Sequence, residues 1–160
     1  MSFRQKLLTL SSLPHWRRQL RESGRRLVVT NGCFDILHLG HATYLEAARA
    51  LGDTLLVGIN SDASVKRLKG PERPVNPEQD RAALVAALES VGAVCLFDET
   101  SAERFLSIAV PDIWAKGADY TLDSLNQDER RTVERAGGRI AFLPLVPGRS
   151  TTATLGRILK

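Results

Sequence analysis

Residues 32–41 decide the fold, and they read Gly32-Cys33-Phe34-Asp35-Ile36-Leu37-His38-Leu39-Gly40-His41. The apolar run 27–30 precedes this stretch, and residues 39–51 carry apolar side chains at helical spacing. This pattern predicts a buried strand, a turn and the N-terminus of a helix. Because the free N–H groups at a helix N-terminus attract anions, we expect an anionic ligand to bind at the turn.

Two histidines lie within this turn, His38 and His41, three residues apart. On a first helical turn such spacing points both imidazole rings to one side. Gly40 between them leaves room for a phosphate to approach the backbone. The site can therefore hold a nucleoside triphosphate by its phosphates; the alternative is a pair of histidines that hydrogen-bond only to local backbone.

The rest of the chain alternates between strand and helix patterns, which is typical of an α/β fold with a parallel sheet. Five strands are expected, at residues 26–30, 54–59, 93–97, 113–116 and 139–143. Helices are expected at residues 14–22, 39–51, 62–67, 77–90, 101–110, 125–136 and 151–159. We expect Asn76 to cap the helix at 77–90 and Gly137-Gly138 to close the helix that ends at 136.

Composition limits the class of protein. A chain of 160 residues with 43% apolar side chains is expected to form a single domain with its own core. The two cysteines, Cys33 and Cys95, form no CxxC pair, so a disulfide framework or a zinc site is not expected. No run of eighteen apolar residues occurs, so we expect no membrane span and a cytoplasmic protein.

The net charge of +4 includes one cluster of arginines near the N-terminus, namely Arg17, Arg18, Arg21, Arg25 and Arg26. Few aromatic residues and no nucleic-acid motif accompany it, so we expect a solvated helix face rather than a nucleic-acid surface. Small phosphorylated ligands explain the charge adequately, and neither nucleic acid nor a membrane is expected as a partner.

Two further segments are candidates for ligand binding. The polar loop 69–76 contains Lys69 and Arg73 beside the expected sheet, where it binds a ligand or simply connects two helices. Near the end, Pro147-Gly148-Arg149-Ser150-Thr151-Thr152 precedes the last expected helix. Its hydroxyls can cap that helix, or bind β- and γ-phosphates together with backbone N–H groups, and these two roles are compatible.

The pattern Gly32-x-Phe34-Asp35-x-x-His38-x-Gly40-His41 resembles the signature of the HxGH nucleotidyltransferase superfamily, whose members join a nucleotide to a phosphorylated small molecule. The segment 147–152 resembles the C-terminal phosphate motif of cytidylyl- and adenylyltransferases in this superfamily. The resemblance implies a Rossmann-like, doubly wound sheet. Residues 25–160 would form the nucleotidyltransferase domain after an N-terminal helical segment at 1–24, and the protein would be a homodimer.

Further blocks resemble the heptose 1-phosphate adenylyltransferase branch of this superfamily, and these are residues 30–35, 58–65, 70–77 and 116–120. Leu145 stands where glycerol 3-phosphate cytidylyltransferases carry an arginine, whereas Arg149 follows the glycine of the motif. The branch implies that ATP and D-glycero-β-D-manno-heptose 1-phosphate give ADP-heptose and pyrophosphate, for lipopolysaccharide core or a related glycan. Two alternatives remain, a glycerol-3-phosphate-type cytidylyltransferase and an inactive nucleotide- or RNA-binding module.

The resemblance also implies roles for individual residues. His38 and His41 would contact the triphosphate and the transition state, while Lys69, preferred over Lys66, would reach the phosphates. Mg²⁺ would be held mainly by substrate oxygens, without protein ligands. The residues expected to bind ATP are Asn31, Gly32, Cys33, Phe34, Asp35, Gly40, Lys116, Gly117, Asp119, Arg149, Ser150, Thr151 and Thr152.

Four residues are expected to bind substrate: Asn60 and Asp62 its hydroxyls, and Arg73 and Arg81 the sugar phosphate or the triphosphate. Each of several candidates has a structural alternative: the segment 60–62 can cap a helix, and Arg81 can form a surface ion pair. Asp35 can brace the turn or bind a substrate hydroxyl. The segment 116–119 reads the adenine edge with its backbone or makes a turn, and we expect Trp114 to pack in the core.

Overall fold

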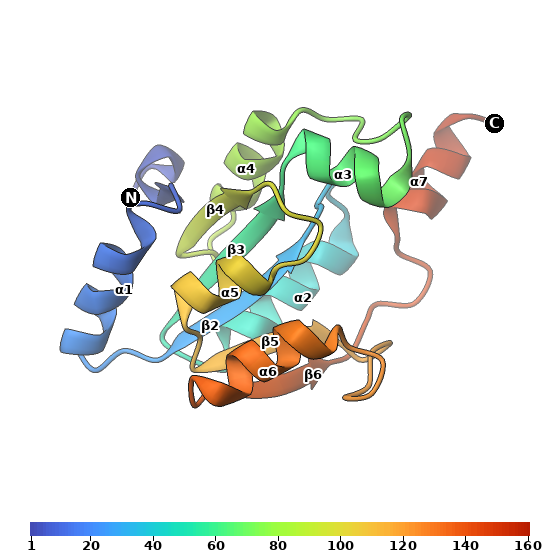
Figure 1. Ribbon diagram of the computed structural model, residues 1–160. Helices are drawn as coiled ribbons and strands as arrows, with labels where there is room; N and C mark the ends of the chain where they lie inside the picture. The colour runs from blue at the N-terminus through green and yellow to red at the C-terminus, as the bar shows by residue number, and fades with distance from the viewer.

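The computed structural model describes residues 1–160 and contains a six-stranded sheet in the order β1-β4-β3-β2-β5-β6 (Figure 1). All neighbouring strands are parallel. The strands are β1 (Leu7–Leu8), β2 (Leu27–Gly32), β3 (Thr54–Asn60), β4 (Ala93–Phe97), β5 (Ile113–Gly117) and β6 (Arg139–Leu143). The prediction of a parallel α/β fold is confirmed.

The expected number of strands was wrong, because the sheet has a sixth strand, β1, at its edge. Leu7 lies opposite Val94 and Leu8 opposite Cys95. A strand of two residues shows no alternation of apolar and polar side chains, so the sequence pattern gives no signal for it.

The helices are α1 (Leu13–Glu22), α2 (Leu39–Arg49), α3 (Asp62–Lys69), α4 (Glu78–Ala86), α5 (Glu103–Ala109), α6 (Gln127–Arg135) and α7 (Thr151–Ile158), with a 3-10 turn at Phe3–Lys6. Helices α1, α5 and α6 cover one face of the sheet, and α2 and α4 cover the other (Figure 1). The expected helices are all present, with ends that differ by a few residues.

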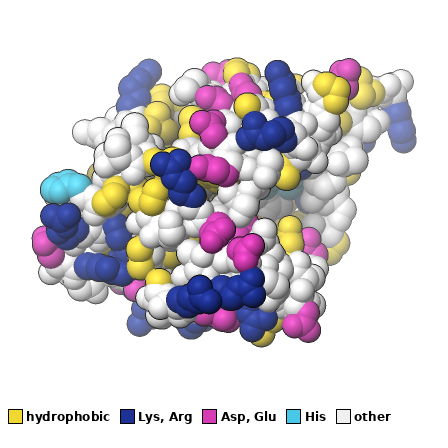
Figure 2. Space-filling model, in the orientation of Figure 1, with side chains coloured by type: hydrophobic (Ala, Val, Ile, Leu, Met, Phe, Trp, Pro, Cys, Tyr) yellow, Lys and Arg dark blue, Asp and Glu magenta, His cyan; other side chains and the backbone are white.

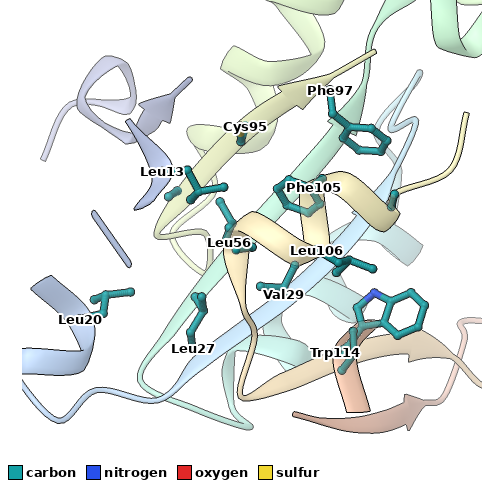
Figure 3. Close-up of a cluster of buried hydrophobic side chains, with 14 of the residues drawn as sticks. Leu13, Leu20, Leu27, Val29, Leu56, Cys95, Phe97, Phe105, Leu106 and Trp114 are labelled. Atoms are coloured by element: carbon teal, nitrogen blue, oxygen red, sulfur yellow. The ribbon is translucent and has the colours of Figure 1, made fainter. Parts of the chain in front are cut away.

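The core consists of two apolar clusters separated by the sheet. Leu27 and Val29 of β2 belong to the cluster with Trp114, Phe105 and α1, shown in Figure 3. Val28, between them, belongs to the cluster on the α2 and α4 face. Both faces of β2 are buried, which explains why its sequence is a continuous apolar run rather than an alternating one.

Of the two helix caps predicted from the sequence, the one at Asn76 is absent and the one at Gly137 is present. Asn76 does not cap α4: Pro77 is the N-cap residue, and the Asn76 side chain donates to the carbonyl of Asp35 at 2.7 Å. The same helix ends at Ala86, about one turn early, because beyond Ala87 the N–H groups of Leu88 and Val91 bond three residues back instead of four. Gly137 closes α6 as predicted, since it has φ +87° and its N–H bonds back to the helix.

The order of the strands determines where a ligand can bind. From β2 the chain moves to β3 and β4 on one side, and then returns to place β5 and β6 on the other side. This change of direction opens a crevice at the carboxyl ends of β2 and β5, where ligands bind in sheets of this type. No helix in the structure has the length and apolar character needed to cross a membrane.

Candidate active site

A cavity of about 380 Å³ opens at the carboxyl ends of β2 and β5, between the N-termini of α2 and α7. Its lining residues are Thr30, Asn31, Gly32, Cys33, Phe34, Asp35, His38, Gly40, His41, Tyr44, Lys69, Arg73, Lys116, Gly117, Asp119, Tyr120, Leu145, Val146, Arg149, Ser150, Thr151 and Thr152. The structure thus brings together every candidate residue named from the sequence except Asn60, Asp62, Arg81 and Lys66, the alternative to Lys69.

The two imidazole rings of His38 and His41 lie against each other in the cavity. Their centroids are 3.8 Å apart and their planes differ by 22°. His38 is the N-cap residue of α2, and its backbone N–H donates to Nδ1 of His41 at 3.4 Å. A neutral ring that accepts at Nδ1 carries its proton on Nε2, so His41 has one N–H left for a ligand.

Both histidines are held neutral at pH 7. Burial, together with the nearby His38 and Lys69, lowers the pKa of His41 to about 4, and burial is the largest of these causes. Burial also lowers the pKa of His38, with a smaller contribution from Arg149. Uncharged rings can stack without repulsion, and each can still donate one hydrogen bond to a phosphate oxygen.

Gly40 leaves space for the His38 ring and for Arg149, which both lie close to its backbone. A Cβ at this position would lie 2.9 Å from the His38 ring and 3.1 Å from the Cβ of Arg149. Any side chain here would therefore displace either the ring or the segment that leads into α7. The sequence predicted space for a phosphate at Gly40, and in the structure that space also admits Arg149.

The turn between β2 and α2 is braced by Asp35, which is 3% exposed. Its carboxylate accepts hydrogen bonds from Nε of Arg73 at 2.7 Å and from the backbone N–H groups of Val75 and Asn76 at 2.9 and 3.0 Å. Burial raises the pKa of Asp35, but these hydrogen bonds outweigh burial and leave the pKa below its usual value. Of the two roles considered, the structure shows the bracing one.

Phe34 shapes the same turn. It adopts a left-handed conformation with φ +48°, which is costly for a residue with a bulky side chain. Its ring lies 5.1 Å from the ring of His41, and a Cβ at Gly32 would come within 3.1 Å of it. The glycine therefore leaves space for the Phe34 ring, and this ring packs beside the ring of His41.

Arg81 is almost fully buried, at 1% exposure, and does not line the cavity. It donates to the carbonyls of Cys33, Asn60 and Asn76 at 2.6, 2.9 and 3.0 Å. It also donates to Oδ1 of Asp62 at 2.8 Å. These four acceptors come from three separate loops, so Arg81 clamps the loops around the cavity and is not the surface ion pair considered from the sequence.

Asn60 and Asp62 likewise have partners within the protein. The Asn60 amide donates to Oγ of Ser64 at 2.9 Å, and Asp62 binds Arg81. Ser61, between them, is the N-cap of α3 and accepts from the N–H of Ser64. The capping role considered for this segment falls on Ser61, and the structure adds no support for substrate binding by its neighbours.

Two cations between the end of α3 and the start of α4 line the cavity, Lys69 and Arg73, whereas Lys66 does not. Arg73 is held by Asp35, and its Nη2 atom is buried without a hydrogen-bond partner. Lys69 is exposed at the C-terminal end of α3 and forms no ion pair. Lys69 therefore has donors available to an anion, and the Arg73 guanidinium, which lines the cavity, has one N–H group without a protein acceptor.

The segment 149–152 forms the opposite wall and begins α7. Ser150 is the N-cap of this helix and accepts from the N–H of Ala153 at 3.0 Å. Thr151 donates from its hydroxyl to the carbonyl of Ile36 at 3.4 Å, which ties α7 to the histidine turn. The capping role is thus present, in a position where the N-terminus of α7 also borders the cavity.

The third wall comes from the end of β5. The ammonium group of Lys116 lies 5.1 Å from the Trp114 ring and 4.3 Å from the Tyr120 ring. Burial lowers the pKa of Lys116, while Glu129 and Asp119 act in the opposite direction. Trp114 is fully buried, as predicted, and its Nε1–H donates to Oδ1 of Asn31 at 3.0 Å.

Five lining residues were not predicted from the sequence: Thr30, Tyr44, Tyr120, Leu145 and Val146. The Tyr44 hydroxyl lies 2.8 Å from Oγ1 of Thr30, and burial raises the pKa of Tyr44 to about 12. Leu145 was singled out only as a departure from a motif. Thr30 and Tyr120 lie in the blocks 30–35 and 116–120 that carry the family resemblance, and this was the available signal for them.

The cavity contains few candidate ligands for a metal ion. No group of three or more His, Cys, Asp or Glu side chains is arranged to hold one. Of the two carboxylates that line the cavity, Asp35 is paired with Arg73, and Asp119 has no such partner. This donor set fits a cation that is coordinated mainly by phosphate oxygens and water.

A cavity at the switch point of a parallel sheet, with two histidines at a helix N-terminus, defines a nucleotide-binding enzyme of the Rossmann-like type. The chain belongs to the cytidylyltransferase-like family of nucleotidyltransferases, whose model matches residues 29–154. The matched region contains every residue that lines the cavity.

Among individual proteins, the chain is similar to the bifunctional protein HldE. It is 50% identical to HldE of Methylobacillus flagellatus over 149 residues, which is 93% of this chain and 29% of that protein. It is 48% identical to HldE of Mesorhizobium japonicum over 95% of this chain and 30% of that one. The chain thus spans under a third of the length of these relatives.

Two solved structures are also similar. The lipopolysaccharide core biosynthesis protein from Thermoplasma volcanium is 31% identical, with a TM-score of 0.62 over 77% of this chain and 98% of that chain. Pantoate-beta-alanine ligase from Francisella tularensis has a TM-score of 0.59 at 12% identity, covering 91% of this chain and 68% of that one. The second likeness shows the fold alone.

Proposed function

We propose that the protein is an adenylyltransferase that transfers AMP from ATP to D-glycero-β-D-manno-heptose 1-phosphate, giving ADP-heptose and pyrophosphate. The observation that carries the reaction type is the pair of neutral, stacked imidazoles that shares a cavity with the N-terminus of α7. The similarity to HldE and to a lipopolysaccharide core biosynthesis protein supports the choice of the heptose substrate. The product would serve lipopolysaccharide core or a related glycan.

The reaction needs no protein nucleophile, because a phosphate oxygen of the acceptor is already an anion. This oxygen attacks the α-phosphorus of ATP and forms the new P–O bond. The bond from that phosphorus to the oxygen that bridges it to the β-phosphorus breaks, and its electron pair leaves with pyrophosphate. The enzyme must align the two substrates in line and stabilise the charge that develops on the phosphate oxygens.

Different residues of the cavity bind different phosphate groups of ATP. The Nε2–H of His41 donates to a phosphate oxygen, and His38 fixes the ring of His41 by its backbone N–H. Arg149 and the free N–H groups at the start of α7 bind the β- and γ-phosphates, which become the leaving group. Lys69 adds a positive charge from the side of α3.

The acceptor phosphate binds at Arg73, whose Nη2 atom lacks a protein partner. Asp35 holds the other edge of this guanidinium, so the free edge is fixed in direction before substrate arrives. The base of ATP lies along the end of β5, where backbone groups of the segment 116–119 read the adenine edge.

Mg²⁺ supports the reaction when it is bound to the triphosphate, by neutralising charge on the phosphate oxygens. Substrate oxygens and water would supply most of its ligands, and Asp119, the lining carboxylate without an ion-pair partner, would be the side chain near enough to hold it. We also propose that the protein is a homodimer, as the family resemblance implies.

The test is pyrophosphate release with ATP, CTP and GTP, each combined with heptose 1-phosphate and with glycerol 3-phosphate. Release with ATP and heptose 1-phosphate, at least about tenfold faster than with any other pair, is the expected result. Preference for CTP and glycerol 3-phosphate would instead identify a cytidylyltransferase. No release with any pair, together with RNA binding that weakens steeply with salt, would identify a binding module.

A further inference from the structure

A second polar cleft, of about 320 Å³, lies at the amino ends of β2 and β5, where these two strands begin. It is lined by Arg17, Arg21, Gly24, Arg25, Arg26 and Asp112, with no apolar side chain. These residues precede β2 and β5, whereas the cavity lies where the same strands end. Since a strand rises about 3.3 Å per residue and β2 has six residues, the two sites are roughly 20 Å apart.

Arg17 forms one wall of this cleft and is not part of a solvated helix face, as the sequence had suggested. Its side chain is 4% exposed. Nε donates to the carbonyl of Val110 at 3.0 Å and Nη2 to Oδ2 of Asp112 at 3.0 Å, whereas Nη1 is buried with no partner. A buried guanidinium is costly unless its N–H groups find acceptors, so this wall of the cleft lacks one acceptor.

The acids of the cleft do not balance its cations. Oδ2 of Asp112 also accepts from the N–H of Leu27, at 2.7 Å, so Arg17 shares this carboxylate oxygen. Asp53, close by, accepts from the backbone N–H of Arg26, and its own carbonyl accepts from Arg25. Burial lowers the pKa of Arg17, and Arg21 lowers it further while Asp112 raises it. Four guanidinium groups thus meet two carboxylates that are already engaged.

The carbonyl groups at the C-terminus of α1 do not supply the negative charge that would balance these arginines. The carbonyls of Leu20 and Arg21, in its last turn, accept from the N–H groups of Arg25 and Gly24. Backbone N–H groups therefore already satisfy these carbonyls, and the side chains of the arginines that follow are not needed to cap the helix. Arg21, Arg25 and Arg26 are exposed, and Figure 2 shows dark blue side chains gathered over α1 at the left of the molecule.

We propose that this cleft binds the phosphoryl group of a small phosphorylated ligand, at a site separate from the catalytic cavity. Guanidinium groups recognise phosphate oxygens through paired N–H donors, and several of them converge here on one concave surface. A surface for nucleic acid would instead spread its cations along a stripe with aromatic side chains between them. The cleft contains no aromatic residue.

The test uses the ¹⁵N-labelled full chain, titrated with inorganic phosphate and separately with pyrophosphate, at constant ionic strength set with NaCl. Two-dimensional NMR distinguishes the cleft, through the amides of Gly24, Arg25 and Asp112, from the catalytic cavity, through the amides of 150–152. The variant Arg21→Gln/Arg25→Gln removes two cations from the cleft and leaves Arg17 and the catalytic residues intact. The matched control, Arg130→Gln/Arg131→Gln on α6, changes the net charge equally at one partly exposed and one exposed ion pair.

We expect saturable shifts of the cleft amides in the wild type, and an apparent affinity at least about tenfold weaker in the cleft variant. The control should bind as the wild type does. Shifts that do not saturate, that NaCl alone reproduces, or that the control loses equally would overturn the proposal. Binding of an RNA oligomer at the cleft without binding of phosphate or pyrophosphate would overturn it as well, in favour of a nucleic-acid surface.

Discussion

Two groups of polar side chains meet at the carboxyl edge of the sheet, and they differ in how many protein partners they have. The bracing group, Asp35, Asn76 and Arg81, hydrogen-bonds within the protein across the turns that surround the cavity. The ligand-facing group, His38, His41, Lys69 and Arg149, forms almost no side-chain bonds and borders the cavity. The first group fixes geometry, and the second leaves donors free for phosphate, so loss of each should affect a different measurement.

The sharpest test of this division is Arg81→Ala. The substitution leaves three carbonyls and the Asp62 carboxylate without their donor. Breaking a buried charged network of this kind costs about 3–5 kcal/mol, so we expect the free energy of unfolding in urea to fall by that amount. Arg104→Ala, at an exposed ion pair, is the control and should cost less than about 1 kcal/mol. A loss below about 1 kcal/mol for Arg81→Ala would remove Arg81 from the bracing group.

The histidines should behave in the opposite way. We expect His38→Ala or His41→Ala to lower turnover roughly a hundredfold or more, since each substitution removes a preorganised donor to the transition state. The free energy of unfolding should change by less than about 1.5 kcal/mol, because neither side chain makes a strong bond within the protein. Pyrophosphate release and urea denaturation measure the two effects. Folded variants with near-normal turnover would contradict the catalytic role.

The sequence predicted the ligand-facing group better than the bracing group. Strand β2, the turn and α2 follow from one apolar run and one helical pattern, and His38 and His41 are close in the chain. Arg81 was expected at the substrate, because a sequence shows an arginine but not the carbonyls of distant loops that converge on it. The edge strand β1 is missed for a similar reason, since only its pairing with β4 makes it a strand.

The pH dependence of stability offers a third comparison. Burial holds the pKa of His41 at about 4, below its value of 6.5 in an unfolded chain. Between these values the unfolded state binds more protons, so this group destabilises the fold as the pH falls from about 6.5 toward 4. We expect the drop in the free energy of unfolding between pH 7 and pH 5 to be about 2 kcal/mol smaller in His41→Gln than in the wild type. An equal drop in both proteins would show that His41 is not desolvated in the fold.

The smallest expected effect concerns Ser150, which combines the properties of the two groups: its side chain accepts a bond within the protein as the cap of α7, and it also borders the cavity. Ser150→Ala should remove the bond to the N–H of Ala153, cost about 1 kcal/mol of helix stability and raise the KM for ATP a few-fold. Ser150→Asn keeps an N-cap acceptor but removes the hydroxyl. If the aligned N-terminus of α7 is what binds phosphate, Ser150→Asn restores both the stability and the KM, and this is the result we expect. Restored stability with a KM still raised would instead place the Ser150 hydroxyl in direct contact with the triphosphate.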